Sequence, residues 1–193
     1  MNNPDYHFVH PHFKLNGFHF NEDDLCRVAY SFIKEGEPFE RAVGDFILYW
    51  FDQNSFIEMQ TSGTTGAPKL IRVDKQAMVN SAIATGEFFD LPSGIKVLHC
   101  LPTHYVAGKM MLVRAFILGW DMDMVAPQSN PLERNETEYD FAAMVPLQAE
   151  HSLGKLHMIK KLILGGAKVS KALSEKLSGL STEIYETYGM TET

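Results

Sequence analysis

Apolar residues recur at helical spacing near the start of the chain. One such run extends from Asn21 to Gly36, and a second follows Pro38 and continues to Trp50. This spacing places the apolar side chains on one face of a helix and predicts two amphipathic helices. Pro38 suits the first turn of the second helix, where a backbone N–H is not needed.

The residues before the first predicted helix combine aromatic side chains with four histidines, which are His7, His10, His12 and His19. Histidines can bind metal ions, but no carboxylate or cysteine at a metal-binding spacing accompanies these four. A packed or solvated leader is the preferred interpretation. We expect a helical leader region at residues 1–54 and an α/β core that binds nucleotide and acyl substrate at residues 55–193.

Short apolar runs alternate with helical patterns in the predicted core. Strands are predicted at residues 56–59, 70–73, 97–101, 122–126, 141–145 and 162–164. Helices are predicted at residues 75–89, 109–118 and 171–177. Asp74 and Ser170 precede two of these helices as N-cap residues. The alternation predicts a layered α/β fold with a mainly parallel sheet flanked by helices, in which ligands bind where strands lead into helices.

Composition and charge narrow the classes of function. The 193 residues are 45% apolar and 11% aromatic, which is enough to bury a core. The formal net charge of -7 gives no general attraction to nucleic acid or anionic lipid. Cys26 and Cys100 are too few for a disulfide framework, and the apolar stretch at residues 110–120 is too short to cross a bilayer. We expect a cytoplasmic protein whose partners are neither nucleic acid nor a membrane.

The strongest local signal is a polar, glycine-containing segment directly after the first predicted strand of the core. Its glycines let the backbone approach a ligand, while its hydroxyls and lysine provide the donors that polyphosphate needs. A solvated hairpin turn has the same composition. The order of residues differs from the common Gly-Lys-Ser/Thr phosphate loop. The segment consists of Thr61, Ser62, Gly63, Thr64, Thr65, Gly66, Ala67, Pro68 and Lys69.

Two further motifs follow in the last part of the chain. Residues 164–167 read Leu-Gly-Gly-Ala, and residues 185–192 read Tyr-Glu-Thr-Tyr-Gly-Met-Thr-Glu. With residues 61–69, in this order, they resemble the three motifs of the acyl-adenylate-forming superfamily, which includes acyl-CoA synthetases, luciferases and peptide-synthetase adenylation domains. The resemblance implies an enzyme that activates a carboxylic acid with ATP and Mg²⁺ and then forms a thioester with coenzyme A.

The resemblance also implies where the nucleotide binds. Residues 61–69 would wrap the β- and γ-phosphates, with Thr61, Ser62, Gly63, Thr64, Thr65, Gly66 and Lys69 in contact with ATP. Gly165, Gly166 and Ala167 would line the adenine and acyl pockets.

Roles at the reacting phosphate are implied in the same way. Tyr188 would stack on adenine beside Gly189, and Thr191 would contact the α-phosphate. Glu192 would hold the magnesium ion, because a carboxylate is the hard ligand that Mg²⁺ prefers. Catalysis would rest on Thr191, Glu192 and Lys69, which together with Mg²⁺ meet the negative charge that accumulates at the α-phosphorus.

The segment at residues 101–108 resembles the acyl-pocket motif Leu-Pro-x-x-His-x-x-Gly of the superfamily. In register, the histidine of the motif falls on Tyr105, and His104 stands one place earlier. Either ring is therefore a candidate for contact with the acyl substrate, and a packed aromatic pair is the structural alternative.

Within the superfamily, the sequence is most similar to the o-succinylbenzoate-CoA ligases of menaquinone biosynthesis. The similarity lies in residues 101–108, in Ala-Met-Val-Pro-Leu-Gln at residues 143–148 and in the short region before residue 61. The substrate of these ligases carries a second carboxylate, for which Arg114 is a candidate bidentate partner. Alternatively, Arg114 extends to solvent or pairs structurally.

The resemblance implies an incomplete domain. Members of the superfamily continue past the third motif with a ribose-binding aspartate, a hinge and a lid that carries a catalytic lysine. We therefore expect a partial N-terminal domain that forms no CoA thioester by itself and whose exposed surface favours a homodimer. Rival functions are another acyl-CoA synthetase, a phosphotransferase and a non-catalytic nucleotide-binding module. Exchange of labelled pyrophosphate into ATP discriminates among these classes.

Overall fold

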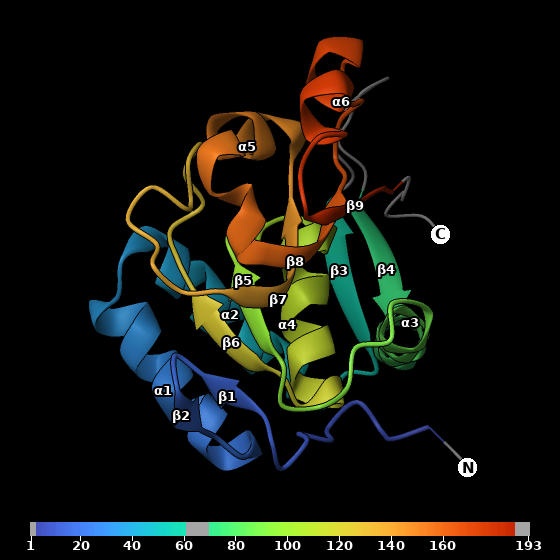
Figure 1. The fold of residues 1–193 in the computed structure, drawn as a ribbon. Coiled ribbons are helices and arrows are strands. Elements are labelled where there is room, and N and C mark those ends of the chain that lie inside the picture. Colours follow the sequence, from blue (N-terminus) through green and yellow to red (C-terminus); the bar gives the residue numbers. More distant parts are fainter. Residues whose placement is uncertain (1–2, 61–69, 188–193) are drawn as a thin grey trace.

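Two sheets organise the chain in a computed structural model that describes residues 3–60 and 70–187 (Figure 1). The large sheet has seven strands in the order β2-β1-β6-β5-β7-β8-β9, and every neighbouring pair is parallel except β1 with β2. Its strands are β1 (Lys14–Leu15), β2 (Phe18–His19), β5 (Lys96–His99), β6 (Asp121–Met124), β7 (Tyr139–Met144), β8 (Ile159–Leu164) and β9 (Glu183–Glu186). This architecture confirms the predicted layered α/β fold with a mainly parallel sheet.

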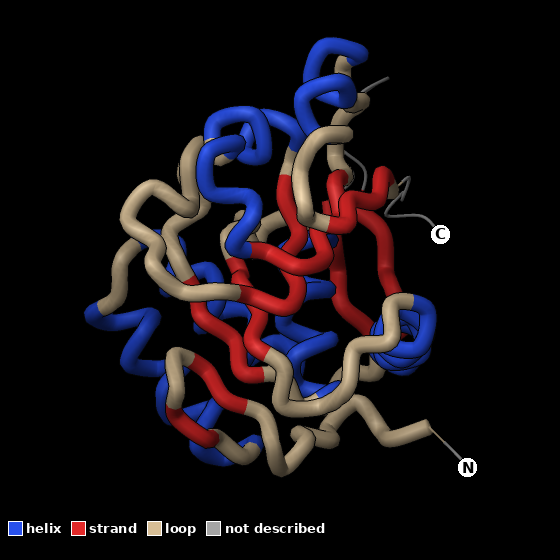
Figure 2. Tube along the Cα trace, viewed as in Figure 1, coloured by secondary structure: helices blue, strands red, loops and turns tan. Residues whose placement is uncertain are grey.

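The helices lie on both sides of the large sheet (Figure 2). They are α1 (Glu22–Glu35), α2 (Pro38–Trp50), α3 (Lys75–Phe88), α4 (Val106–Leu118), α5 (Pro146–His151), the 3-10 helix η1 (Leu153–Met158) and α6 (Lys171–Leu177). Within residues 3–60 and 70–187, none of the helices has the length and apolar character to cross a bilayer.

Helix starts follow the predicted capping residues. The Asp74 side chain accepts a hydrogen bond from the Ala77 N–H at 2.8 Å, and that of Ser170 accepts one from the Leu173 N–H at 3.1 Å. Each cap satisfies a backbone donor that has no partner within its helix. The predicted N-caps of α3 and α6 are therefore confirmed.

The structure confirms the predicted strands on both sides of residues 61–69 but not the expectation that ligand segments join a strand to a helix. Strands β3 (Phe56–Gln60) and β4 (Leu70–Asp74) pair antiparallel with each other, so that Gln60 stands opposite Leu70. The segment therefore joins the two strands of a hairpin and does not join a strand to a helix. A hairpin is the alternative that the composition of residues 61–69 allowed.

The predicted helical leader also contributes strands. Residues 14–19 hold β1 and β2, and β1 pairs with β6 in parallel, with Lys14 opposite Asp121. Leu15 and Phe13 are buried in the same apolar cluster as Leu25 of α1. Because β1 is only two residues long, it carries too few alternating positions to be detected from sequence.

Core side chains alternate between the two faces of the large sheet. Val97 and Phe141 belong to an apolar cluster with residues of α1, α2, α3, α4 and β3, whereas Leu98 and Ala142 belong to a second cluster with residues of α5, η1 and α6. Successive residues of a strand point to opposite faces, so a strand covered on both sides is apolar throughout. The large sheet is therefore the middle layer, with helices on both faces.

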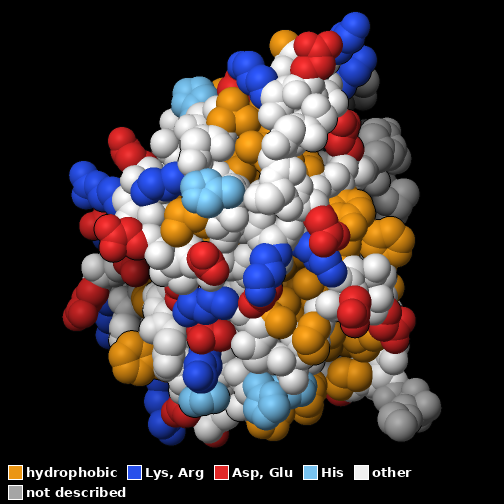
Figure 3. Space-filling model, viewed as in Figure 1, with side chains coloured by type: hydrophobic (Ala, Val, Ile, Leu, Met, Phe, Trp, Pro, Cys, Tyr) orange, Lys and Arg blue, Asp and Glu red, His pale blue; other side chains and the backbone are white. Residues whose placement is uncertain are grey.

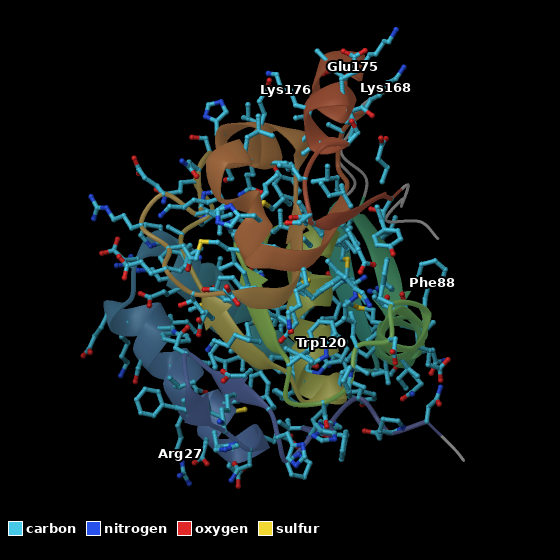
Figure 4. The ribbon with its side chains drawn as sticks, in the orientation of Figure 1. Arg27, Phe88, Trp120, Lys168, Glu175 and Lys176 are labelled. Carbon is cyan, nitrogen blue, oxygen red and sulfur yellow. The ribbon has the colours of Figure 1, made fainter. Side chains whose placement is uncertain are left out.

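Most charged side chains lie on the outside, and Lys75 is the buried exception among the described residues. In Figure 4, Lys168, Glu175 and Lys176 extend away from the body of the molecule at α6, and Trp120 lies in its interior. On the face shown in Figure 3, positive and negative side chains are interspersed, and its described residues form no broad basic area of the kind that attracts phosphate backbones. No three His, Cys, Asp or Glu side chains among residues 3–60 and 70–187 are grouped so as to hold a metal ion.

Candidate nucleotide and substrate site

The parallel strands bring several predicted site segments to one edge of the large sheet. Strands β5, β7, β8 and β9 run in the same direction, so their carboxyl ends meet at this edge. Residues 100–105 follow β5, Val145 follows β7, residues 165–167 follow β8 and Thr187 follows β9. We call this region the carboxyl edge. Ligands of open α/β sheets bind at such an edge.

Gly165 and Thr187 are in direct contact at the carboxyl edge. The Thr187 N–H donates to the Leu164 carbonyl oxygen at 2.7 Å, and its hydroxyl donates to the same oxygen at 3.1 Å. A Cβ atom on Gly165 would lie 2.8 Å from Thr187 Oγ1, which is too close for real side chains. A side chain at position 165 would therefore force the Thr187 side chain to move.

Gly166 and Ala167 continue this segment at the surface. Gly166 has a φ of 79°, a left-handed conformation that glycine adopts without steric cost. Gly166 and Ala167 are both exposed. Residues 166 and 167, which are predicted to line the adenine and acyl pockets, are therefore accessible to a ligand.

The remaining predicted nucleotide contacts lie outside the described residues. Residues 61–69 follow β3, and residues 188–193 follow directly on Thr187. The contacts concerned are Thr61, Ser62, Gly63, Thr64, Thr65, Gly66, Lys69, Tyr188, Gly189, Thr191 and Glu192. Their roles stay predictions.

The loop between β5 and α4 presents both candidate rings of the acyl motif. His104 is exposed, and Tyr105 at the N-cap position of α4 is 60% exposed. The Lys109 side chain of α4 holds the backbone of this loop in place. Its Nζ donates to the Thr103 carbonyl oxygen at 2.7 Å and to the His104 carbonyl oxygen at 3.0 Å. A side chain on Gly108 would collide with the Pro102 carbonyl. The motif glycine is therefore needed for this turn.

Arg114 lies farther along α4. It is eight residues beyond the first residue of the helix, which corresponds to roughly 12 Å along the axis from the carboxyl edge. Among the described residues, its Nε has no hydrogen-bond partner, and its Nη1 contacts only the Met111 sulfur, at 3.8 Å. Burial lowers the pKa of Arg114 to about 10, so the guanidinium stays charged at neutral pH. The structure thus separates Arg114 from His104 and Tyr105 but leaves it without a described carboxylate partner.

Gln148 hydrogen-bonds to the segments that follow β5, β6 and β7. It was not predicted as a site residue. Its amide nitrogen donates to the carbonyl oxygens of Cys100 at 2.9 Å and Gln128 at 3.1 Å, and its amide oxygen accepts from the Val145 N–H at 3.1 Å. The side chain is 4% exposed. The sequence signal for this role is a glutamine at the end of the apolar segment at residues 143–148. If its amide is buried there, it needs hydrogen-bond partners.

A cavity of about 550 Å³ adjoins the carboxyl edge between the start of α2 and the segments that follow β5 and β6. Its walls include Pro38, Phe39 and Val125, and His99 is among its lining residues. His99 Nε2 lies 3.3 Å from Thr103 Oγ1. Residues 101–104 of the predicted acyl motif also line the cavity. The contributions of α2 and of residues 125–127 could not be predicted, because these segments are distant in sequence from the motif.

The fold and these strand-end loops define an α/β domain whose ligand site lies at the carboxyl edge of a parallel sheet. The family of AMP-binding enzymes matches residues 53–193, and the chain belongs to this family. The superfamily predicted from the three motifs is thereby confirmed.

Individual relatives match part of the chain. The 2-succinylbenzoate–CoA ligase of Staphylococcus aureus (strain MSSA476) is 32% identical over 143 residues, which cover 70% of this chain and 29% of the relative. An acyl-CoA synthetase (AMP-forming)/AMP-acid ligase II-like protein from Dyadobacter fermentans superimposes with a TM-score of 0.75 at 36% identity, covering 86% of this chain and 49% of that protein. The chain thus spans about 29% of the length of the curated relative.

A third protein supports the fold alone. The O-succinylbenzoate coenzyme A synthetase of Bacillus subtilis, solved in complex with ATP and magnesium ion, superimposes with a TM-score of 0.61 at 24% identity. The match covers 70% of this chain and 30% of that protein.

Proposed function

We propose that the chain is the nucleotide-binding part of an acid–thiol ligase. The ligase activates a carboxylic acid with ATP as an acyl-adenylate and then forms a thioester with coenzyme A. The substrate we propose is o-succinylbenzoate, which places the protein in menaquinone biosynthesis. The observation that carries this proposal is the contact of Gly165 with Thr187, because it sets the second motif beside the start of the third.

The proposed chemistry depends on charge stabilisation. A substrate carboxylate oxygen attacks the α-phosphorus, and pyrophosphate leaves. Lys69 and backbone N–H groups at residues 61–69 hold the departing phosphates, Tyr188 stacks on adenine and Thr191 donates to the α-phosphate. Glu192 holds Mg²⁺, which neutralises phosphate charge. The exposed backbone of Gly166 fits a purine placed against the carboxyl edge.

Arg114 supports the choice of a dicarboxylic substrate. Arg114 is half-buried, and its Nε is buried without a described hydrogen-bond partner, which is costly unless a ligand supplies one. Arginine binds a carboxylate through two parallel hydrogen bonds. We therefore propose that Arg114 binds the carboxylate of o-succinylbenzoate that does not react, while the other carboxylate lies near residues 104 and 105.

Pyrophosphate exchange tests the proposal. The measurement is carboxylate-dependent incorporation of labelled pyrophosphate into ATP, with these 193 residues and with any longer polypeptide that contains them. We expect o-succinylbenzoate to support exchange far better than acetate or a fatty acid. ATP binding without exchange in either polypeptide would instead favour a non-catalytic nucleotide-binding module.

Arg114→Leu tests the substrate assignment separately. Loss of a charged hydrogen-bonding partner should reduce o-succinylbenzoate-dependent exchange by about 10- to 100-fold. Exchange with benzoate, which lacks the second carboxylate, should not change. Arg134→Leu at an exposed position is the matched control. Equal loss with both substrates would assign the protein to a general acyl-CoA synthetase and give Arg114 a structural role.

A further inference from the structure

Lys109 connects the first turn of α4 to the loop that precedes this helix. The lysine side chain is half-buried, and its Nζ lies 5.9 Å from the centre of the Phe46 ring of α2. The Nζ donates to the carbonyl oxygens of Thr103 at 2.7 Å and His104 at 3.0 Å. Among the described residues, no carboxylate forms a salt bridge with it. The described hydrogen-bond partners of this ammonium group are therefore two consecutive backbone carbonyls.

The two bonded carbonyl groups flank a single residue, His104. The Thr103 carbonyl belongs to the peptide unit before the His104 Cα, and the His104 carbonyl belongs to the peptide unit after it. Because each peptide unit is planar, the orientations of these two units fix φ and ψ of His104. The same two angles set the direction in which the His104 side chain leaves the backbone. One Nζ holds both carbonyl groups, so Lys109 restrains this direction.

Other contacts hold the residues on either side of His104. Thr103 is buried in the protein, with an exposed fraction of 4%. The Tyr105 N–H donates to the Pro102 carbonyl oxygen at 3.2 Å, and the Tyr105 carbonyl oxygen accepts from the Lys109 N–H at 3.2 Å. The neighbours of His104 are thus fixed by the core and by the start of α4, whereas the carbonyl groups around His104 itself depend on the Lys109 side chain.

The position of His104 distinguishes it from the second candidate ring of the acyl motif. His104 lines the cavity of about 550 Å³ beside the carboxyl edge, whereas Tyr105 is not among the described residues that line it. The motif histidine falls on Tyr105 in register, so this chain carries its histidine one position earlier. A ring shifted by one position leaves the backbone in a different direction. The backbone support that Lys109 gives is therefore located at the residue where this chain departs from the motif.

We propose that Lys109 is a positioning residue of the acyl site, which acts through the backbone of Thr103 and His104 to orient the His104 ring toward the carboxylic acid. This inference rests on the proposed function, because the acid is the substrate of the adenylation. Lys109 is not among the described lining residues of the cavity, so its effect on the acid is indirect. Misplacement of a positioning group by about 1 Å costs up to roughly 100-fold in rate.

Lys109→Met tests the inference by removing the donor and keeping a side chain of similar length. In pyrophosphate exchange we expect the KM for o-succinylbenzoate to rise about 10-fold and the KM for ATP to stay unchanged. Lys155→Met is the matched control, because Lys155 Nζ also donates to two carbonyl oxygens, those of Glu133 at 2.9 Å and Asn135 at 2.8 Å. These residues precede β7 and β8, at the opposite edge of the sheet. The control should leave both KM values unchanged, and an equal rise in both variants would overturn the inference.

His104→Ala separates positioning from a general effect of the lost charge or of lower stability. If Lys109 acts through His104, Lys109→Met should change the KM for the acid by less than about 2-fold in the His104→Ala background. A lysine that acts by its charge or by stability alone gives the full effect in both backgrounds. That result, or an unchanged KM for the acid in Lys109→Met itself, would contradict the role of Lys109.

Amide hydrogen exchange of the ligand-free protein tests the loop without substrate. In Lys109→Met, the Tyr105 N–H should exchange with solvent about 10-fold faster, because the turn that holds it opens more often. Lys155→Met should leave this rate unchanged. An unchanged rate in Lys109→Met would overturn the inference even where the adenylation proposal holds. Absence of acid-dependent pyrophosphate exchange in the original protein would overturn the adenylation proposal and the role toward the acid together, so the two failures are distinguishable.

Discussion

The Gln148 side chain hydrogen-bonds to three segments that meet at the carboxyl edge. Replacing it with leucine leaves the carbonyl oxygens of Cys100 and Gln128 and the Val145 N–H without their partners. Each unsatisfied group costs about 1–3 kcal/mol, reduced where water reaches it, so we expect Gln148→Leu to lower the free energy of unfolding by about 2–4 kcal/mol. Urea denaturation measures this loss. The exposed neighbour Leu147 provides the control, because Leu147→Ala should change stability by less than about 0.5 kcal/mol.

Gly165 and Thr187 allow a test of the contact between two motifs. Gly165→Ala places a Cβ against Thr187 Oγ1. It should lower the free energy of unfolding by about 1–3 kcal/mol and should weaken ATP binding. Adding Thr187→Ala removes the clashing oxygen and should restore both properties in part. Gly154→Ala, where a Cβ meets nothing within 4 Å, is the matched control. Additive effects of the two substitutions, measured by denaturation and calorimetry, would contradict the proposed contact.

At the scale of elements, an ion pair joins the end of α2 to the start of α3. Lys75 Nζ lies 2.7 Å from Asp52 Oδ1, and the lysine side chain is completely buried. Burial alone raises the pKa of Asp52, but hydrogen bonds from Lys75 and Asn54 outweigh it, so the net pKa is below the ordinary value of 3.8. A carboxyl whose pKa is lowered by folding stabilises the protein above its unfolded pKa.

Asp52→Asn should therefore destabilise the protein in a pH-dependent manner. Near neutral pH we expect the free energy of unfolding to fall by about 1–3 kcal/mol. This value lies between those for exposed and buried ion pairs, because Asp52 is partly exposed. The difference from the original protein should be full above about pH 4 and should shrink as pH falls through the lowered pKa of Asp52. Urea denaturation at a series of pH values measures it. Glu150→Gln, which breaks an exposed pair with Lys176, should show a difference below about 1 kcal/mol.

Elements with a long periodic pattern could be predicted from the sequence, and short ones could not. Helices α1, α2, α3 and α6 lie within one residue of their predicted limits, because apolar spacing and caps such as Asp74 are local signals. Strands β1, β2 and β9 and helix α5 were missed. β9 carries two exposed glutamates and an exposed tyrosine in four residues, so it lacks the apolar run by which β5, β6, β7 and β8 were found.

At the scale of the whole molecule, the proposed function requires that all three motifs contact one ligand. Residues 164–167 and Thr187 meet at the carboxyl edge, whereas residues 61–69 and 188–192 lie outside the described part. We predict that ATP with Mg²⁺ slows amide hydrogen exchange in peptides covering all three motifs and leaves α1 unchanged. Protection of residues 61–69 without protection of residues 188–192 would contradict a common site. ADP without Mg²⁺ serves as the weaker comparison ligand.

The sequence by itself determined the family and the chemistry it implies, because three motifs in fixed order are local strings of residues. It also determined the layered fold through the alternation of strands and helices. Tertiary structure alone decided that β1 pairs with β6, that Gln148 hydrogen-bonds to segments after three strands and that His99 lines a cavity beside α2. The physical reason is that strand pairing, buried hydrogen bonds and cavities depend on residues distant in sequence, which no local pattern encodes.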